Sequence, residues 1–185
     1  MNRWHLQQAL KVIRSGGVIA YPTEAVYGLG CQPENFIAVK RILDLKNRPI
    51  NKGLIIIAAA VEQLDRYVSF TDISRYRQIL QTWPGPVTWL LPARPGVADW
   101  IRGDHDSLAV RVSDHPVVRE LCRLTGPLIS TSANPAGCPP AKSARKVRYY
   151  FGRSIDYILP GYIGEQQKPT EIRDAATGEV IRPGT

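Results

Sequence analysis

Cysteine is scarce in this chain. The 185 residues include only Cys31, Cys122 and Cys138, which are odd in number, far apart and without C-x-x-C spacing. Such a set is unsuited to a disulfide framework and to a cysteine-based zinc site. We expect three reduced thiols, because free cysteine is usually buried as a small apolar residue.

Long hydrophobic runs are also missing. Residues 1–14 mix apolar positions at helical spacing with His5, Gln8 and Lys11, so they resemble neither a signal peptide nor a membrane span. An apolar fraction of 44% and a charged fraction of 22% are ordinary for a globular protein and argue against disorder or a fibrous repeat. The sequence therefore predicts one cytoplasmic domain over residues 1–185, with no membrane partner.

Acidic residues are too few to balance the basic ones. The chain has 16 Asp and Glu against 24 Lys and Arg, which gives a formal net charge of +8. This excess favours a polyanionic partner such as a nucleotide or RNA. Solubility alone would explain the same excess, so the charge leaves both interpretations open.

Apolar runs that look like buried strands alternate with amphipathic stretches, which is typical of an α/β protein with one continuous sheet. Strands are predicted at 18–21, 54–58, 87–91, 108–112 and 128–130. Helices are predicted at 6–14, 36–45, 73–82, 116–124 and 144–151. Residues 170–185 alternate apolar and polar positions around Gly178, which predicts a short hairpin.

A polar segment follows the first predicted strand. Residues 21–30, YPTEAVYGLG, place Thr23, Glu24 and two glycines in what we interpret as a loop at a strand's carboxyl end, where open α/β sheets bind ligands. Pro33 stands in the place of the third glycine of G-x-G-x-x-G, which argues against a dinucleotide site. A tight turn without a ligand is the alternative.

Three cations lie just before the strand predicted at 54–58. Pro49 should end the preceding helix and fix an extended path, so that Lys46 and Arg48, both expected to be exposed, point to the same side. With Lys52 they suit a polyphosphate, because arginine offers a planar fork and lysine a point charge to phosphate oxygens. A solvated basic turn would have the same composition.

Small polar side chains follow the strand at 128–130. The segment 130–137, STSANPAG, supplies hydroxyl and amide groups that can surround an anion together with free backbone N–H groups. It is not a Walker A loop, because the G-K pair is missing. Alone, it would form a helix cap or a turn as often as a ligand loop.

Two arginines stand in apolar strand patterns, Arg111 within 107–112 and Arg182 within 181–184. A buried arginine needs a partner, because an unpaired charge in the interior is costly. Glu24 and a substrate carboxylate are equally suitable partners. The three histidines lie outside all of these segments.

Together these segments resemble the YrdC/TsaC family of threonylcarbamoyl-AMP synthases from one end of the chain to the other. The resemblance is carried by YPTEAVYGLG at 21–30, LKNRP at 45–49 with KGLIII at 52–57, WPGPVTWLLP at 83–92, SLAVRV at 107–112, STSAN at 130–134 and PTEIRD at 169–174. Six blocks in this order are far more specific than any one of them. The chain is most similar to the short, single-domain bacterial branch.

The resemblance implies an α/β fold, a twisted open mixed sheet with flanking helices around a large electropositive cleft, unrelated to Rossmann and P-loop folds. It implies nucleotide contacts for Lys46, Arg48, Lys52, Ser107, Ser132, Asn134 and Arg182. It implies threonine contacts for Thr23, Ala25, Arg111, Ser130 and Thr170. The chain departs from many relatives at Ala25 and Ile57, where they have threonine and histidine, and Lys52 replaces a more usual asparagine.

The implied enzyme is a nucleotidyltransferase. It would form L-threonylcarbamoyladenylate and pyrophosphate from L-threonine, bicarbonate or CO2, and ATP, for N6-threonylcarbamoyladenosine modification of tRNA. Mg2+ is expected with the ATP rather than on protein ligands, no protein nucleophile is needed, and the product would pass to tRNA threonylcarbamoyl-transfer proteins. The alternative is a double-stranded RNA or tRNA-binding module without chemistry, which the basic charge would also fit.

Overall fold

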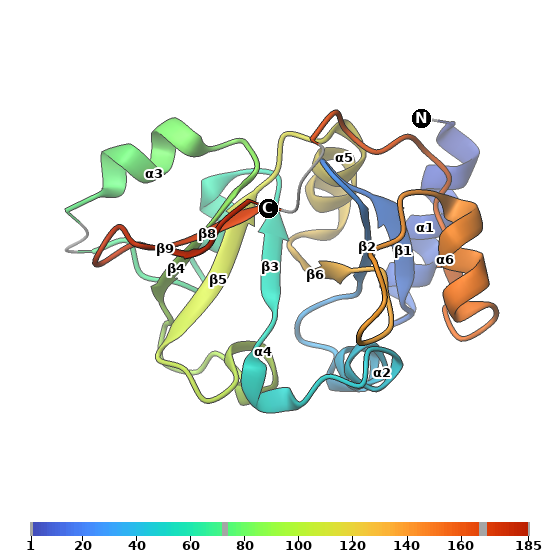
Figure 1. Cartoon of the computed structure of the whole chain (residues 1–185), viewed down its shortest axis with the longest axis horizontal. Coiled ribbons are helices and arrows are strands. Elements are labelled where there is room, and N and C mark those ends of the chain that lie inside the picture. Colours follow the sequence, from blue (N-terminus) through green and yellow to red (C-terminus); the bar gives the residue numbers. More distant parts are fainter. Residues whose placement is uncertain (1, 72–73, 167–169, 185) are drawn as a thin grey trace.

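The computed structural model describes residues 2–71, 74–166 and 170–184. Within them, nine strands form one twisted mixed sheet in the order β7-β1-β2-β6-β3-β5-β4-β8-β9 (Figure 1). The strands are β1 Ile19–Pro22, β2 Tyr27–Gly30, β3 Ile55–Ala58, β4 Val87–Pro92, β5 Ser107–Val112, β6 Leu128–Ser132, β7 Tyr157–Ile158, β8 Glu171–Asp174 and β9 Val180–Arg182. The predicted continuous mixed sheet is confirmed.

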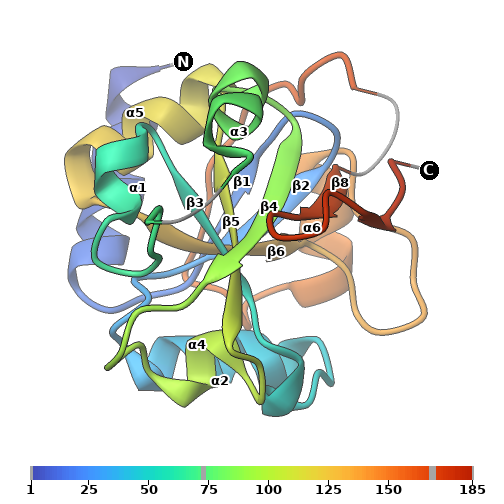
Figure 2. The same ribbon diagram turned by 90° about the vertical axis from the view of Figure 1, so that its left-hand side faces the viewer.

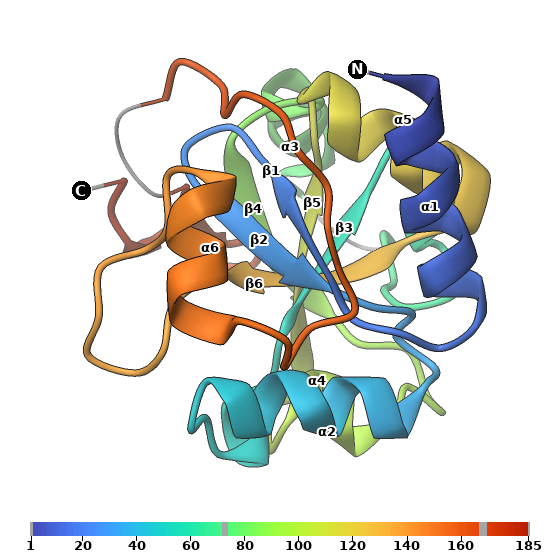
Figure 3. The same ribbon diagram turned by 90° about the vertical axis from the view of Figure 1, so that its right-hand side faces the viewer.

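Helices cover both faces of this sheet (Figures 2 and 3). They are α1 Arg3–Arg14, α2 Phe36–Leu45, α3 Tyr76–Thr82, α4 Asp99–Arg102, α5 Pro116–Thr125 and α6 Ala144–Phe151, with 3-10 turns η1 Ile50–Lys52 and η2 Val61–Leu64. Alternation along the strands separates two cores, since successive side chains point to opposite faces. Ile19 packs with α1 and α5, whereas Ala20 packs with α2, α4 and α6. None of the helices in the described ranges has the length and apolar character that crossing a bilayer requires.

Most predicted elements coincide with observed ones. The helices predicted at 36–45 and 144–151 have the bounds of α2 and α6, and each predicted strand overlaps an observed one. The terminal hairpin is β8 and β9, which pair antiparallel, and β8 extends the sheet by pairing parallel with β4. Residue 73 of the third predicted helix lies outside the described residues, and that helix is observed from Tyr76.

The segment 21–30 differs from the loop that the sequence predicted. Residues 27–30 form β2, which pairs antiparallel with β1 on one side and with β6 on the other. Two glycines made this stretch look like a turn, but the crowding between β1 and β6 explains Gly30. A Cβ there would lie 2.6 Å from the carbonyl oxygen of Ile129 and 2.7 Å from a ring carbon of Tyr21. Within this segment, Thr23, Ala25, Val26 and Gly28 border open space where a ligand could lie.

Gly30→Ala should therefore lower the free energy of unfolding by roughly 1–3 kcal/mol, through overpacking. Gly28→Ala is the matched control in the same strand, because its added Cβ would meet its nearest neighbours at 3.4 Å. Urea denaturation followed by circular dichroism measures both variants. If both variants lost the same free energy of unfolding, close packing around β2 would not explain the glycine at position 30.

Candidate functional site

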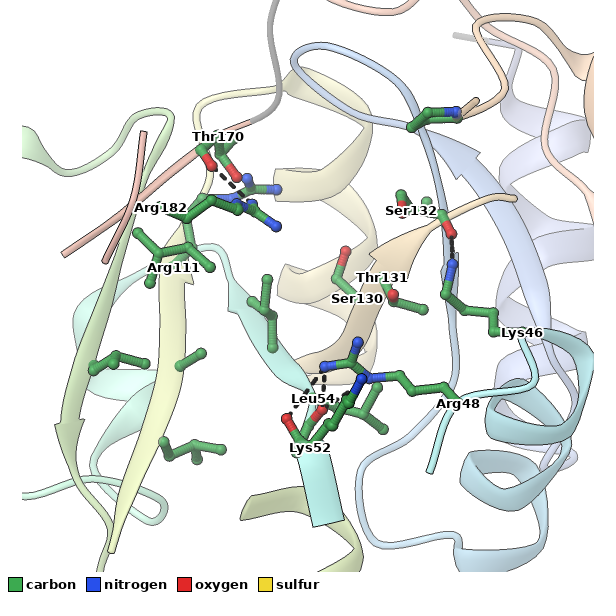
Figure 4. A pocket seen from close by; sticks show the side chains of 18 of the residues that line it. Lys46, Arg48, Lys52, Leu54, Arg111, Ser130, Thr131, Ser132, Thr170 and Arg182 are labelled. Atoms are coloured by element: carbon green, nitrogen blue, oxygen red, sulfur yellow. Dashed lines mark hydrogen bonds between the residues drawn. The ribbon is translucent and has the colours of Figure 1, made fainter. Parts of the chain in front are cut away.

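A cavity of about 660 Å³ lies over the middle of the sheet (Figure 4). Among the described residues that line it there is no Asp or Glu. Its basic side chains come from six residues: Lys46, Arg48, Lys52, Arg102, Arg111 and Arg182. Positive charge of this kind, without a counter-charge in the same wall, favours an anionic ligand.

The cavity brings together every residue that the sequence assigned to a ligand. These are Thr23, Ala25, Lys46, Arg48, Lys52, Ser107, Arg111, Ser130, Ser132, Asn134, Thr170 and Arg182. They come from the β1–β2 hairpin, the end of α2, η1, β5, β6 and the β8–β9 hairpin. Their placement in one cavity is observed, whereas their contacts with particular ligands stay predictions.

Strand register builds the floor of the cavity. Ser130 of β6 lies opposite Ile55 of β3, and Ile55 lies opposite Ala109 of β5. Residues two apart on a strand share a face, and Ile57 and Leu128 pack in the core with α1 and α5. The cavity therefore lies on the sheet face that α1 and α5 cover, beyond the part that these helices bury.

Lys46 is buried, which corrects the exposed cation that the sequence predicted. Lys46 directly follows the last residue of α2, and the residue is only 8% exposed. Nζ donates hydrogen bonds to the carbonyl oxygens of Ser132 at 2.5 Å and Asn134 at 2.9 Å. Burial, with Arg48 as a second cause, lowers the pKa of Lys46 to about 8. Lys46 thus connects α2 to the segment 130–137 by hydrogen bonds. Its ammonium group loses a proton in mildly alkaline solution.

The turn after α2 aims Arg48 at the cavity. Asn47 adopts a left-handed φ of 48°, and the N–H groups of residues 47 and 48 bond to carbonyls of the last turn of α2. Arg48 then donates to the carbonyl oxygen of Gly53 at 2.9 Å. The extended path predicted through Pro49 is therefore preceded by a helix cap, and this cap positions the two cations.

Arg111 and Glu24 form a buried ion pair, with Arg111 Nη2 at 3.3 Å from Glu24 Oε2 and side chains that are 6% and 8% exposed. Burial by itself would raise the pKa of Glu24, but Arg111 and then the Ser113 hydroxyl, which donates to Oε1 at 2.6 Å, hold that pKa below its usual value. The Glu24 partner that the sequence proposed is confirmed. Because Arg111 also lines the cavity, this pair is compatible with a ligand carboxylate on the same guanidinium.

Arg182 lies beside Thr170 at one end of the cavity. Its guanidinium donates to the carbonyl oxygen of Thr170 at 2.8 Å. Figure 4 shows Arg182, Thr170 and Arg111 together, apart from the cations near α2 and η1. Burial, and then the charge of Arg111, lowers the pKa of Arg182. The cavity thus has two cationic groups, Arg111 with Arg182 and the cations near α2 and η1, and the contact of Arg182 with nucleotide stays a prediction.

The cavity also contains residues that the sequence gave no reason to select. His105 lines it although it lies outside the segments that the sequence singled out, and Arg102 donates to the carbonyl oxygen of His105 at 2.9 Å. The apolar wall comes from four strands and consists of Leu90, Leu108, Ile172 and Ile181. No local pattern marks these residues, because they meet only when β8 and β9 pair with β4.

Comparisons of the sequence find relatives over its full length. Residues 11–184 match the Sua5/yciO/yrdC family model, whose description is telomere recombination. A threonylcarbamoyl-AMP synthase of Pseudomonas entomophila is 52% identical over 184 residues, covering 100% of both chains. A protein of the same name from Stutzerimonas stutzeri is 53% identical over 180 residues, covering 97% of each chain.

Solved structures are similar in fold. Sua5 of P. abyssi, complexed with L-threonine, superposes with a TM-score of 0.92 and 34% identity over 100% of this chain and 55% of that chain. YciO of E. coli gives a TM-score of 0.87 and 28% identity, over 100% and 91% of the two chains. The present chain therefore spans about half of the Sua5 protein and nearly all of YciO.

Glu24→Gln should lower the free energy of unfolding by about 3–5 kcal/mol at neutral pH, because it leaves the Arg111 charge buried without a partner. The wild type should keep this contribution above pH 4.5, the ordinary pKa of the carboxyl, and lose it as the pH falls through the lower pKa of the folded state. Urea denaturation at several pH values measures both effects. The double variant Glu24→Gln with Arg111→Met removes both charges and should recover part of the loss. A double variant no more stable than the single one would contradict the ion-pair explanation.

Proposed function

The chain belongs to the Sua5/yciO/yrdC family, and we propose that it acts as a threonylcarbamoyl-AMP synthase in tRNA modification. The enzyme joins L-threonine, bicarbonate or CO2, and ATP, and releases L-threonylcarbamoyladenylate and pyrophosphate. Beyond the names of the relatives, one observation carries the proposal. One cavity contains two separate cationic groups, and no carboxylate is among the described residues that line it. Two anionic reactants held side by side require such an arrangement.

The cations near α2 and η1 are proposed to hold the phosphates of ATP. Arg48 supplies a planar fork, and Lys46 and Lys52 supply point charges. Lys46 already holds the backbone of Ser132 and Asn134, so the small side chains of that segment border the same space. Ser107 and Arg182 complete the proposed nucleotide contacts at other parts of the wall.

Arg111 is proposed to hold the carboxylate of threonine, with Ser130 and Thr170 beside it. A guanidinium can grip a carboxylate with two parallel hydrogen bonds. The ion pair with Glu24 fixes the side chain before the ligand arrives, so less conformational entropy is lost on binding. Thr23 and Ala25, at the tip of the β1–β2 hairpin, close this end of the cavity.

The proposed chemistry is a nucleotidyl transfer without a protein nucleophile. The threonine amine adds to CO2 to give a carbamate, and a carbamate oxygen attacks the α-phosphate of ATP and expels pyrophosphate. Holding the two reactants in line can supply about 7–11 kcal/mol of the barrier. The fixed cations stabilise the charge that builds on the phosphates, and an enclosed site protects the carbamate and the mixed anhydride from water.

Mg2+ is proposed to arrive on ATP as part of the substrate. Because the described lining has no carboxylate, the phosphate oxygens and water would be its ligands rather than side chains. The adenylate would then pass to tRNA threonylcarbamoyl-transfer proteins in the cytoplasm. The instability of the product supports this proposal, because an unstable product must be consumed soon after it forms.

Incubation of the pure protein with ATP, bicarbonate and labelled threonine tests the function. We expect release of pyrophosphate that depends on threonine and on bicarbonate, with label in an adenylate detected by mass spectrometry. Pyrophosphate release that ignores threonine would remove threonine as the substrate, and no release with any combination would overturn the proposal.

The affinity for ATP should fall as the pH rises through about 8, because Lys46 then loses its proton. One lost proton predicts a decrease of up to about tenfold per pH unit. Calorimetric titration with ATP between neutral pH and pH 9.5 measures the profile. Lys46→Arg keeps the charge over this range and should flatten it. A flat profile in the wild type would mean that the Lys46 charge is not linked to ATP binding.

Arg111→Lys should raise the KM for threonine at least about tenfold, which corresponds to about 1.4 kcal/mol, while the KM for ATP changes by less than about twofold. Lysine keeps the charge but cannot reproduce the two parallel hydrogen bonds. The melting temperature should fall as well, since the contact with Glu24 is also altered. Steady-state kinetics for both substrates gives the comparison. Equal changes in the two KM values would leave Arg111 with a structural role alone.

A further inference from the structure

A second basic surface lies outside the cavity, on the outer side of α6. We call it the α6 face and define it by Lys142, Arg145, Lys146 and Tyr149, which with Pro140 and Ser143 line a shallow hollow of about 530 Å³. All four defining residues are exposed. The stretch 139–153 contains five Lys and Arg and no Asp or Glu, although the whole chain has a net charge of only +8. The excess charge of the chain is therefore concentrated here.

The cations of this face have no counter-charges. Some exposed cations elsewhere on the surface are paired with carboxylates, such as Lys40 with Asp44 and Arg41 with Asp156. No ion pair within the described ranges involves a basic residue of 139–153. The buried side of α6 is ordinary, because Val147 and Phe151 pack into the core. The basic residues on the outer side are therefore not needed for ion pairs within the fold.

An aromatic ring lies exposed among these charges. Tyr149 is 78% exposed, and the Nζ atom of Lys146 lies 4.6 Å from its ring centroid and 4.4 Å from that of Tyr150. An acidic protein would need the cations but not a bare ring. Single-stranded nucleic acid uses both, because its phosphates follow the cations and an unpaired base stacks on the ring. The combination favours nucleic acid over an acidic protein.

The α6 face adjoins the substrate cavity. Pro140 lines both hollows, and the connecting segment is fixed, since Tyr27 N donates to the carbonyl oxygen of Ala141 at 2.7 Å and Ala141 N to that of Ala133 at 3.0 Å. Figure 3 shows the loop that leads from β6 into α6. An occupant of the α6 face would therefore sit at the margin of the cavity without entering it.

We propose that the α6 face docks single-stranded RNA, with phosphates on Lys142, Arg145 and Lys146 and one unpaired base stacked on Tyr149. The choice of RNA over DNA rests on the proposed function. Nucleic-acid binding by the α6 face does not depend on that function, because none of these side chains lines the substrate cavity. Its role would be to keep the enzyme near the RNA that its product modifies.

Fluorescence anisotropy with a labelled, single-stranded RNA loop tests the proposal. Lys146→Glu should weaken binding at least about tenfold and reduce the slope of log affinity against log salt by about 1. Lys11→Glu is the matched control, since Lys11 is also exposed but lies on α1, against the other face of the sheet, and it should change the affinity less than about twofold. Tyr149→Ala should weaken binding at least about fivefold with no change in that slope, because stacking releases no counterions.

Threonine-dependent pyrophosphate release in the same variants separates this proposal from the proposed function. We expect Lys146→Glu and Tyr149→Ala to keep wild-type turnover. An RNA affinity that Lys146→Glu leaves unchanged, or lowers no more than Lys11→Glu does, would overturn the proposal. So would displacement of the RNA by polyglutamate together with an unaffected Tyr149→Ala variant, because the surface would then bind any polyanion, an acidic protein included. If the protein showed no synthase activity but its RNA binding still depended on Lys146, the proposed function would be wrong and the docking surface would be supported.

Discussion

A buried guanidinium in the middle of the sheet is the constraint on which the site depends. Arg111 belongs to β5, and its counter-charge Glu24 sits at the tip of the β1–β2 hairpin, with β6 and β3 between them in the sheet. An unpaired charge here would cost several kcal/mol, so the hairpin must reach across the sheet. The segment after β7 secures it, because Gly164 N and Gln166 N bond to the carbonyls of Thr23 and Glu24. One end of the cavity is thus fixed by electrostatics.

The other end of the cavity is fixed by Lys46, whose hydrogen bonds join α2 to the segment after β6. Burial lowers the pKa of Lys46, of Arg48 and of Arg182, so the free protein holds its cations at some electrostatic cost. The anionic reactants proposed for this site would relieve that cost when they bind. Charges placed in advance need no reorganisation during the reaction, which is the main way a protein without a nucleophile can accelerate phosphoryl chemistry.

The segment after β6 connects the two basic surfaces of the molecule. The end of β6 and the residues up to Asn134 border the cavity, and the chain then leads through Pro140 into α6. The surfaces differ in their physical character. In the cavity, Lys46 is buried and Arg48 is half-buried, and both donate to backbone carbonyls. On α6 the cations are exposed and unpaired, as suits a long, flexible polyanion whose phosphates exchange contacts with the solvent.

The sequence by itself determined the α/β class, most helices and strands, and the residues assigned to ligands, all of which line the cavity. Apolar periodicity and the six ordered blocks are properties of neighbouring residues, so they can be read without coordinates. Only the tertiary structure decided that residues 27–30 form a strand, that Lys46 is buried, and that Arg182 lies beside Thr170. Each of these depends on pairing between segments far apart in the chain. A local pattern cannot encode that pairing, because β2 is a strand only where β1 and β6 supply its hydrogen-bond partners.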